Sequence, residues 1–194
     1  MLVCLPAVVS GQAADPPVTA ESYRPITGMQ RIDWAMDGTI GKRSLTVVGP
    51  LATMWQTGFN TPEEWGRGAS GIAKRYAQRE ADVALSNTIE AGLGAVWGED
   101  PRYIPSGRKG LWPRARYAIK TVFLAQRRDG SLKPAWGRYA GNTLNNVIEN
   151  RWLPPSMTTP GQTASRSALG MLGRLGGNAW EEFWPDVVRH FRRQ

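Results

Sequence analysis

The segment from Thr61 to Arg102 constrains the fold most, because it carries the signals of one long helix with a defined end. Thr61 is a helix-capping residue type, Pro62 suits the first helical position, and Glu64 stands where its carboxylate can reach back to a free backbone N–H. Pro101 ends the segment because it has no N–H and disfavours the α conformation in the residue before it. We therefore expect a long helix here, with the rest of the chain packed around it.

Apolar residues within this segment recur at three-, four- and seven-residue spacings, as in an amphipathic helix. Charged residues stand between them at Arg75, Arg79, Asp82 and Glu90. The pattern predicts an apolar stripe that faces a core, and the many alanines nearby would let another helix approach closely. The stripe consists of Ile72, Tyr76, Val83, Ile89, Leu93 and Val96.

Further segments of the chain also show helical periodicity or helix-start signals. Thr159-Pro160 repeats the cap-and-proline pattern of Thr61-Pro62. The chain has 22 glycines and 14 prolines, so we expect turns to break the helices frequently. The sequence predicts an all-α protein of four to six helices, with Gly/Ala-rich packing faces and proline-terminated helix ends. The other predicted helices are 27–39 with Ile32 and Met36 inward, 111–128, 133–149 and 159–175, and residues 179–194 are expected to fold back.

The segment 44–62 contains no charged residue over 19 positions. Its length alone would suit a membrane span, but its threonines and the Gly49-Pro50 pair make it polar and interrupted. We expect a buried or interfacial helix at about 50–57. A membrane-spanning segment stays open as the alternative.

Nine tryptophans are spread along the chain rather than gathered in one motif. Tryptophan buries a large area, so the first interpretation is that most of them anchor the core and wedge between helices. The second is interfacial, because tryptophan is also enriched at the level of lipid headgroups. The nine are Trp34, Trp55, Trp65, Trp97, Trp112, Trp136, Trp152, Trp180 and Trp184.

The start of the chain reads as a secretory signal. An apolar run is followed by Gly11 and Ala13, at positions three and one before a cleavage that would leave Ala14 first. No Lys or Arg precedes the run, so we interpret residues 1–13 as a truncated signal peptide; the alternative is a short apolar tail of a cytosolic protein. We expect residues 14–43 to form an extended leader and a short helix, and residues 44–194 to form a single helical domain.

Cys4 is the only cysteine and His190 the only histidine, which excludes an intrachain disulfide and a zinc site of the Cys/His type. A Ser-His-Asp triad would need His190 in the C-terminal tail. The letters G-x-G-x-x-G occur at 66–71, but they follow a helix start rather than a strand, so we expect no dinucleotide site. The sequence therefore predicts no cofactor, no metal and no catalytic residue.

The densest polar cluster consists of Glu99, Asp100 and Arg102. Paired carboxylates beside an arginine could perform acid–base chemistry on an anionic substrate, which would make the protein a hydrolase. No His, Cys or metal-ligand spacing accompanies them. We therefore interpret the cluster as a structural, ion-paired helix end.

Positive charge is concentrated between residues 102 and 138, where ten basic residues and one acidic residue give +9 against a total of +8. A basic amphipathic helix flanked by basic loops suits an anionic membrane surface. Nucleic acid would fit the charge too, but we do not expect it as the partner of an exported protein. The alternative without a function is that the basic segment is only a solvent-exposed face of the protein. The predicted contact residues are Arg108, Lys109, Trp112, Arg114, Arg116 and Lys120.

Three motifs resemble a family of uncharacterised exported proteins, rich in Gly and Trp, that is associated with acidobacteria and related Gram-negative bacteria. They are P-x-E-W-G at 62–66, E-D-P-R-Y at 99–103 and E-F-W-P-D at 182–186, and the likeness covers roughly residues 44–193. The resemblance implies export and a Gly-rich helical body. It implies no activity, so no catalytic residue is carried over.

From the residues and this resemblance we expect a non-enzymatic exported envelope protein, located in the periplasm or on the periplasmic face of an envelope membrane. It would associate with an anionic membrane surface through the basic segment 102–138. One alternative is a helical subunit of a larger envelope membrane complex, bound to an envelope protein partner. The other is the hydrolase that uses Glu99 and Asp100. The sequence leaves oligomerisation open.

Overall fold

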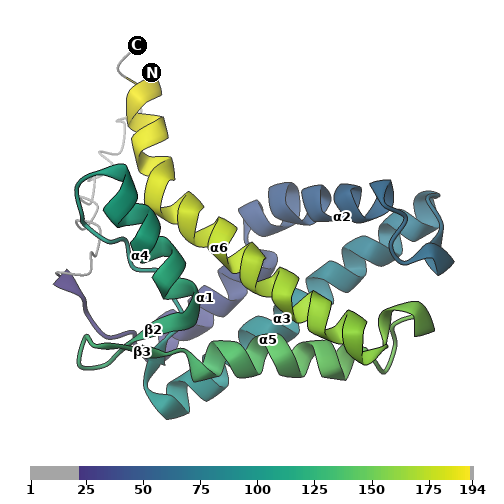
Figure 1. Cartoon of the computed structure of the whole chain (residues 1–194), viewed down its shortest axis with the longest axis horizontal. Helices are drawn as coiled ribbons and strands as arrows, with labels where there is room; N and C mark the ends of the chain where they lie inside the picture. Colours follow the sequence, from purple (N-terminus) through teal and green to yellow (C-terminus); the bar gives the residue numbers. More distant parts are fainter. Residues whose placement is uncertain (1–21, 193–194) are drawn as a thin grey trace, which may run out of the picture.

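The computed structural model describes residues 22–192, which contain six α-helices and a small antiparallel sheet (Figure 1). This confirms the predicted all-α class of four to six helices. The sheet has the strand order β1-β2-β3 and lies beside one end of the helical body. The helices are α1 (Gly28–Ile40), α2 (Gly49–Gly58), α3 (Ala69–Trp97), α4 (Leu111–Phe123), α5 (Trp136–Glu149) and α6 (Pro160–Phe191), and the strands are β1 (Glu99–Asp100), β2 (Leu124–Arg127) and β3 (Leu132–Pro134).

Helix α3 is the centre of the packing. It contacts α1, α2 and most extensively α5, while α6 packs on α4 and α5 (Figure 1). Short turns complete the described chain: a π-helical stretch at Ser44–Val48 leads into α2, and 3-10 turns occupy Glu63–Trp65 and Pro155–Met157. Since α1 packs against α3, the predicted boundary at residue 44 does not separate α1 from the helical body.

The predicted helix start at Thr61 is wrong, because α3 begins at Ala69. Arg75, which is fully buried, donates hydrogen bonds to the carbonyl oxygens of Thr61 at 2.9 Å, Pro62 at 2.8 Å and Gly66 at 2.5 Å. These carbonyls turn towards the guanidinium, so the 60–66 segment folds over the first turns of α3 instead of joining them. A side chain fourteen residues away thus outweighs a local capping signal.

Glu64 does not form the expected capping box. Its carboxylate accepts a hydrogen bond from the Ser156 hydroxyl at 2.8 Å, which ties this loop to the turn before α6. At the other end α3 stops at Trp97, where Gly98 adopts a left-handed conformation with φ 69°. The helix therefore ends a few residues ahead of Pro101.

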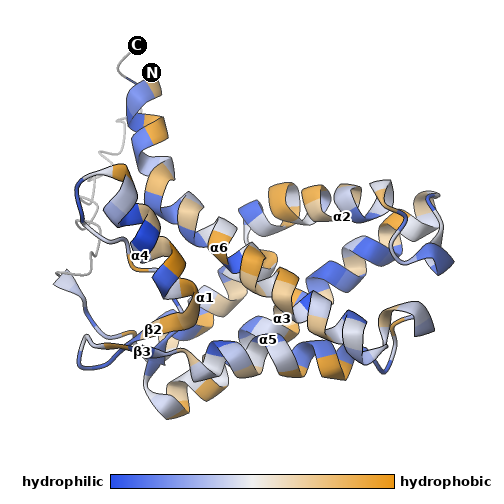
Figure 2. Cartoon of the chain, in the orientation of Figure 1, coloured by the Kyte–Doolittle hydropathy of each residue, from blue (hydrophilic) through white to orange (hydrophobic). Residues whose placement is uncertain are grey.

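The most deeply buried side chains of α3 are charged rather than apolar, contrary to the prediction. Arg75 and Glu90 are buried, whereas Ile72 is 44% exposed and Val96 79% exposed. Figure 2 shows apolar and polar residues alternating along the helices. Among the buried residues of the described chain, 16 are polar or charged and six are hydrophobic. The other four residues of the predicted stripe are half-buried and none of the six is fully buried, so the stripe faces the core only in part. Buried charges are tolerated here because each meets a partner from another element, as described below.

Helix α1 shows the same reversal. Thr27 and Gln30 cap it through a reciprocal pair of hydrogen bonds, and the helix spans almost the predicted range. Ile32 and Met36, expected inward, are 58% and 50% exposed, and Arg31 is buried in their place. Arg31 donates a 2.5 Å hydrogen bond to the carbonyl of Glu99 and so joins α1 to the sheet.

The tryptophans are mostly outside the core. Seven of the nine are exposed, so the interpretation as core anchors is wrong. Helix α2 covers the helix expected near 50–57, but Leu51, Met54 and Trp55 are 61%, 69% and 70% exposed. In the part of the chain that the structure describes, no helix combines the length and apolarity needed to cross a membrane.

Three predicted element ends also differ. The helix expected over 111–128 stops at Phe123, because the backbone beyond it pairs as strand β2 with β3 through a turn at 128–131. The next helix starts at Trp136 rather than at residue 133, where β3 intervenes. Thr159 caps α6 as predicted, but the expected fold-back is wrong, because α6 is a single helix of 32 residues that continues through Pro185 to Phe191.

Candidate functional site

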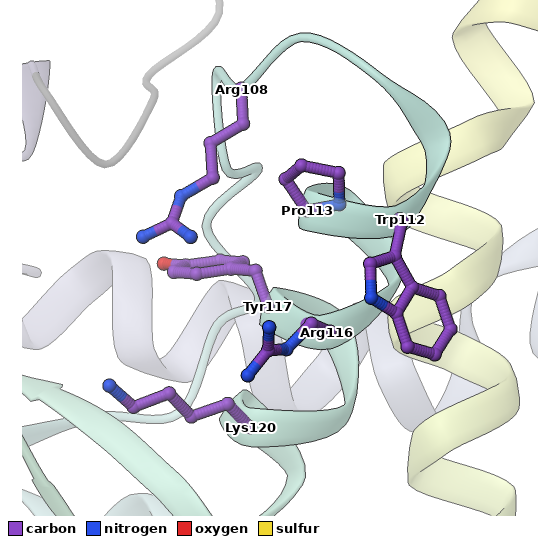
Figure 3. A pocket seen from close by; sticks show the side chains of 6 residues that line it. All are labelled: Arg108, Trp112, Pro113, Arg116, Tyr117 and Lys120. Atoms are coloured by element: carbon purple, nitrogen blue, oxygen red, sulfur yellow. The ribbon is translucent and has the colours of Figure 1, made fainter.

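The strongest candidate site is an open hollow on α4, with a volume of about 480 Å³ (Figure 3). Four of the six predicted contact residues line it. Trp112, Arg116 and Lys120 recur every four residues, so the helical period places them along one side of α4. Arg108 comes from the loop before the helix. The full lining is Arg108, Trp112, Pro113, Arg116, Tyr117 and Lys120, the set that we call the α4 hollow.

The loop before α4 carries Arg108 back over the helix. Gly107 and Gly110 have φ values of 67° and 86°, which favour glycine, and they bend the backbone on both sides of Arg108 and Lys109. The Arg108 guanidinium thereby lies 5.5 Å from the centroid of the Tyr117 ring. At this distance the cation is attracted by the face of the ring.

Tyr117 forms the buried floor of the hollow. Only 4% of the residue is exposed, and among the described residues its hydroxyl has no hydrogen-bond partner. Burial, and then the negative charge of Glu182, raise the pKa of Tyr117, while Arg108 opposes them. The phenol therefore stays protonated at neutral pH and is a free hydrogen-bond donor.

The positive charge of the hollow is not neutralised within the described chain. None of the ion pairs found over residues 22–192 involves Arg108, Arg116 or Lys120, and all three residues are exposed. Three cations around one concave surface produce a local positive potential, which attracts anions.

The other two predicted contact residues lie elsewhere. Arg114 lies on the side of α4 that packs against α6, where it binds Glu182 at 2.8 Å and also Asp186. Its guanidinium lies 4.6 Å from the Phe183 ring. Burial lowers the pKa of Arg114, but hydrogen bonds to Asp186 and Glu182 outweigh it and raise the pKa overall. Lys109 is exposed in the loop beside the hollow without lining it.

Glu182 of α6 holds the loop that positions Arg108. Its buried carboxylate accepts hydrogen bonds from the Tyr103 hydroxyl at 2.6 Å, the Ser106 backbone N–H at 2.9 Å and the Ser106 hydroxyl at 2.5 Å. Burial would raise the pKa of Glu182, but these bonds and that from Arg114 lower it. The carboxylate is therefore ionised at neutral pH, and it fixes the loop to α6.

Sequence reasoning missed Tyr117 and Glu182. Tyr117 stands three residues before Lys120, so a helical projection places the two next to each other on α4. Glu182 is 76 residues from Ser106, and no local pattern could pair them.

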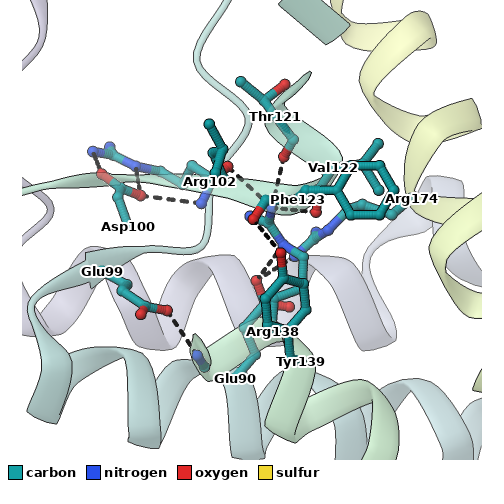
Figure 4. A network of polar contacts seen from close by, with 12 residues as sticks. Glu90, Glu99, Asp100, Arg102, Thr121, Val122, Phe123, Arg138, Tyr139 and Arg174 are labelled. Carbon is teal, nitrogen blue, oxygen red and sulfur yellow. Dashed lines mark hydrogen bonds and ion pairs between the residues drawn. The ribbon is translucent and has the colours of Figure 1, made fainter. Parts of the chain in front are cut away.

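In the cluster of Glu99, Asp100 and Arg102 both carboxylates are buried, and Arg102 is half-buried beside them (Figure 4). Glu99 is 2% exposed, and its carboxylate accepts hydrogen bonds from the backbone N–H groups of Trp136 at 3.0 Å and Gly137 at 2.7 Å, in the first turn of α5. An acidic group at a helix N-terminus is favourable. This carboxylate is thus already engaged within the fold.

Asp100 is 1% exposed and binds Arg102 through the backbone N–H at 3.0 Å and the guanidinium at 2.8 Å. It also accepts a hydrogen bond from the Tyr23 hydroxyl at 3.3 Å. Burial, and then the charge of Asp100, raise the pKa of Tyr23 to about 12. Neither acid of the cluster is open to a substrate, which supports the structural interpretation over the hydrolase.

A second buried network joins four helices (Figure 4). Glu90 of α3 pairs with Arg138 of α5 at 3.0 Å and with Arg174 of α6. Arg138 also donates to the carbonyl oxygens of Thr121 at 2.6 Å and Val122 at 3.0 Å near the end of α4. Burial lowers the pKa of Arg174 to about 10 although Glu90 opposes this shift. The network is a polar centre of the fold.

Comparison with known proteins adds no relative: no family model matches the chain, and no curated protein or solved structure matches it. Within residues 22–192 no group of three or more His, Cys, Asp and Glu side chains is placed to hold a metal ion. The resemblance to exported Gly- and Trp-rich proteins stays a prediction.

Proposed function

We propose that this protein is a non-enzymatic, exported envelope protein that associates with an anionic membrane surface, with the α4 hollow at the headgroups and outward apolar side chains against the lipid. The observation that carries the proposal is the reversed polarity of the fold. In the described chain 28 large apolar side chains are exposed, whereas the buried hydrophobic core has six residues. So many exposed large apolar side chains beside so small a buried core suit a protein whose apolar surface is covered by a membrane or by a partner.

Apolar contact is the larger of the two forces in this proposal. Burying one large apolar side chain contributes about 1.5–3 kcal/mol, so lipid contact by even five of the exposed residues would contribute on the order of 10 kcal/mol. The three cations of the α4 hollow contribute about 1 kcal/mol each at an anionic surface. Apolar contact would therefore supply the affinity, and charge the selectivity and the orientation.

Charge and aromatic placement favour lipid over a protein partner. Trp112 is 69% exposed and lies on the same side of α4 as Arg116 and Lys120. Tryptophan beside Lys and Arg is typical of side chains at the headgroup level of a bilayer. The positive charge extends beyond the hollow, because Lys109, Arg128 and Lys133 of the same segment are exposed and form no ion pair among the described residues.

Vesicle sedimentation tests the proposal. The full chain should bind vesicles containing anionic lipid roughly a hundredfold more tightly than neutral vesicles, since three charges correspond to about 3 kcal/mol. The variant Arg108→Gln/Arg116→Gln/Lys120→Gln should lose this preference but keep the weaker neutral binding. Rising salt should reduce the preference in the same way.

The matched control is Lys42→Gln/Lys74→Gln/Arg151→Gln, which removes the same charge from exposed positions outside the basic segment. It should keep most of the preference for anionic vesicles. Equal loss in both triple variants would mean that only net charge matters. A full chain that stays monomeric in buffer and binds no vesicle would refute membrane association.

Export is tested by the mass of the native N-terminus. Cleavage after Ala13 would leave Ala14 first; the predicted signal lies outside the described residues. A native protein that still begins at Met1 and is found in the cytoplasm would contradict the periplasmic location.

One observation favours the second candidate, a subunit of a larger envelope membrane complex. At Gly173, Gly176 and Gly177 of α6 an added Cβ would meet nothing within 4 Å, so this helix offers bare backbone to a neighbouring helix. Purification in mild detergent distinguishes the two candidates. A stoichiometric partner that remains bound after lipid removal would favour the complex, and a single chain would favour direct membrane association.

A further inference from the structure

We propose that the α4 hollow is a discrete site for one phosphate group carried on a small organic moiety. The inference deepens the proposed function, and it rests on that function only for the lipid as the source of the phosphate. It starts from two independent observations: three unneutralised cations around one concavity, and a buried tyrosine hydroxyl without a partner at its floor.

The directions of the side chains suit a single anion. In Figure 3 the Arg108 guanidinium, the Tyr117 hydroxyl and the Lys120 ammonium point to the same side, with Arg116 between the ring and Lys120. Arg108 approaches from a loop and the others from α4, so the cations surround the position from two elements. A surface that attracts anions only through its overall charge would not require these donors to point to one place.

The donor set favours phosphate over carboxylate. The two guanidiniums and the ammonium of the hollow supply many N–H donors and three positive charges, and Tyr117 adds an O–H donor. A phosphate monoester has up to two negative charges and three terminal oxygens for these donors, and arginine forms paired hydrogen bonds with phosphate. A carboxylate has one charge and two oxygens and would leave part of the set unused.

The hollow also has room for what the phosphate is attached to. Its volume of about 480 Å³ exceeds that of a phosphate group alone, and Trp112 and Pro113 supply apolar lining, with the Trp112 indole on the other side of Arg116 from the Tyr117 hydroxyl (Figure 3). These two residues can contact a glycerol or sugar carbon skeleton while the cations hold the phosphate. Both a lipid headgroup and a soluble phosphate ester present this chemistry.

A change at Tyr117 distinguishes specific phosphate binding from general attraction of anions by positive charge. Its hydroxyl makes no hydrogen bond in the described chain, so the Tyr117→Phe change keeps the ring and its edge contact with Tyr103. We expect the variant to melt at the same temperature as the parent or above it. We also expect it to bind phosphate about tenfold more weakly, because one donor to a charged acceptor is lost.

The experiment uses the full chain in neutral detergent micelles, titrated calorimetrically with inorganic phosphate and with glycerol 3-phosphate at constant ionic strength. We expect saturable 1:1 binding that is tighter for glycerol 3-phosphate. Arg116→Gln and Tyr117→Phe should weaken it, whereas Lys109→Gln, which removes an adjacent cation outside the hollow, should not. Unsaturable binding, or equal effects of the three variants, would overturn the site.

Vesicles distinguish the two sources of the phosphate. If a lipid supplies it, vesicles with a phosphomonoester headgroup should bind more tightly than phosphatidylserine vesicles of equal surface charge, and Tyr117→Phe should remove the difference. If a soluble ester supplies it, calorimetric binding should persist while the two kinds of vesicle bind equally. Phosphate binding in micelles without any vesicle binding would refute membrane association but not the site, and the reverse result would refute only the site.

Discussion

The buried network around Glu90 gives the sharpest test of the polar interior. In the Glu90→Gln variant the side chain keeps its shape and one acceptor oxygen but loses its charge, so the guanidiniums of Arg138 and Arg174 remain buried without a counter-ion. Side-chain exposure is 8% for Glu90, 6% for Arg138 and 24% for Arg174. Breaking a buried pair in this way costs about 3–5 kcal/mol, a large part of the 5–15 kcal/mol that stabilises a typical domain.

The matched control is Glu181→Gln, because Glu181 pairs with Arg43 at 2.8 Å while the two side chains are 53% and 45% exposed. An exposed pair contributes about 0–1 kcal/mol, so this variant should melt within about 3 °C of the parent. For Glu90→Gln we expect a decrease of roughly 10 °C, at 2–4 °C per kcal/mol for a chain of this size.

Circular dichroism melts of both variants in the same micelles, at low and high salt, measure the difference. Salt should hardly change the Glu90→Gln effect, because ions in solution screen buried pairs weakly. Equal shifts in the two variants, or a Glu90→Gln effect that disappears in high salt, would refute the reasoning. Either result would mean that water reaches the network and that its charges are solvated.

Three further predictions concern the helical body. Burial, and then a neighbouring carboxylate, raise the pKa of Glu149 from 4.5 to about 8, so the folded protein holds a proton that the unfolded chain releases above pH 4.5. This contribution to stability is complete below pH 4.5 and is lost as the pH rises towards 8, by on the order of 5 kcal/mol. Glu149→Gln should therefore flatten the pH profile of urea unfolding, and an unchanged profile would contradict the raised pKa. At Gly141 an added Cβ would lie 2.9 Å from a backbone oxygen of α3, so Gly141→Ala should lower the free energy of unfolding by about 1–3 kcal/mol. At Gly173 an added Cβ would meet nothing within 4 Å, so Gly173→Ala should raise the free energy of unfolding by up to about 1 kcal/mol. Equal thermal shifts in the two variants would argue against the close contact between α5 and α3. Replacing Glu99 and Asp100 by Gln and Asn should lower the melting temperature and leave vesicle binding per folded molecule unchanged, and lost binding at unchanged stability would point to a direct role.

The α4 hollow was partly predictable. The 3.6-residue period alone places Trp112, Arg116 and Lys120 on one side of a helix, and the charge count singles out that part of the chain. The same count cannot tell Arg114, which pairs with Glu182 across the helix interface, from the cations left free. The partner of each charge depends on which helix packs beside it, and that information is long-range.

Helix-capping patterns likewise show that a local signal can be overruled by a long-range contact. Thr159-Pro160 starts α6 as the pattern predicts, and the Thr159 hydroxyl accepts a hydrogen bond from the backbone N–H of Gln162 at 3.2 Å. Thr61-Pro62 has the same letters but starts no helix, since the buried guanidinium of Arg75 takes the carbonyls of that loop. A capping motif determines what the backbone can do locally, and a tertiary contact decides whether it does so.

By itself the sequence determined the helical class, the approximate position of the helices and the concentration of charge between residues 102 and 138. Periodicity also identified two faces on α3, but only the tertiary structure decided which of them is inside. The reason is physical: an amphipathic pattern is satisfied equally by an apolar core in water and by a polar core within apolar surroundings. Here Gly137 and Gly141 bring α5 close to α3, and Glu90 meets the guanidiniums of Arg138 and Arg174, so the polar face is the one that finds partners.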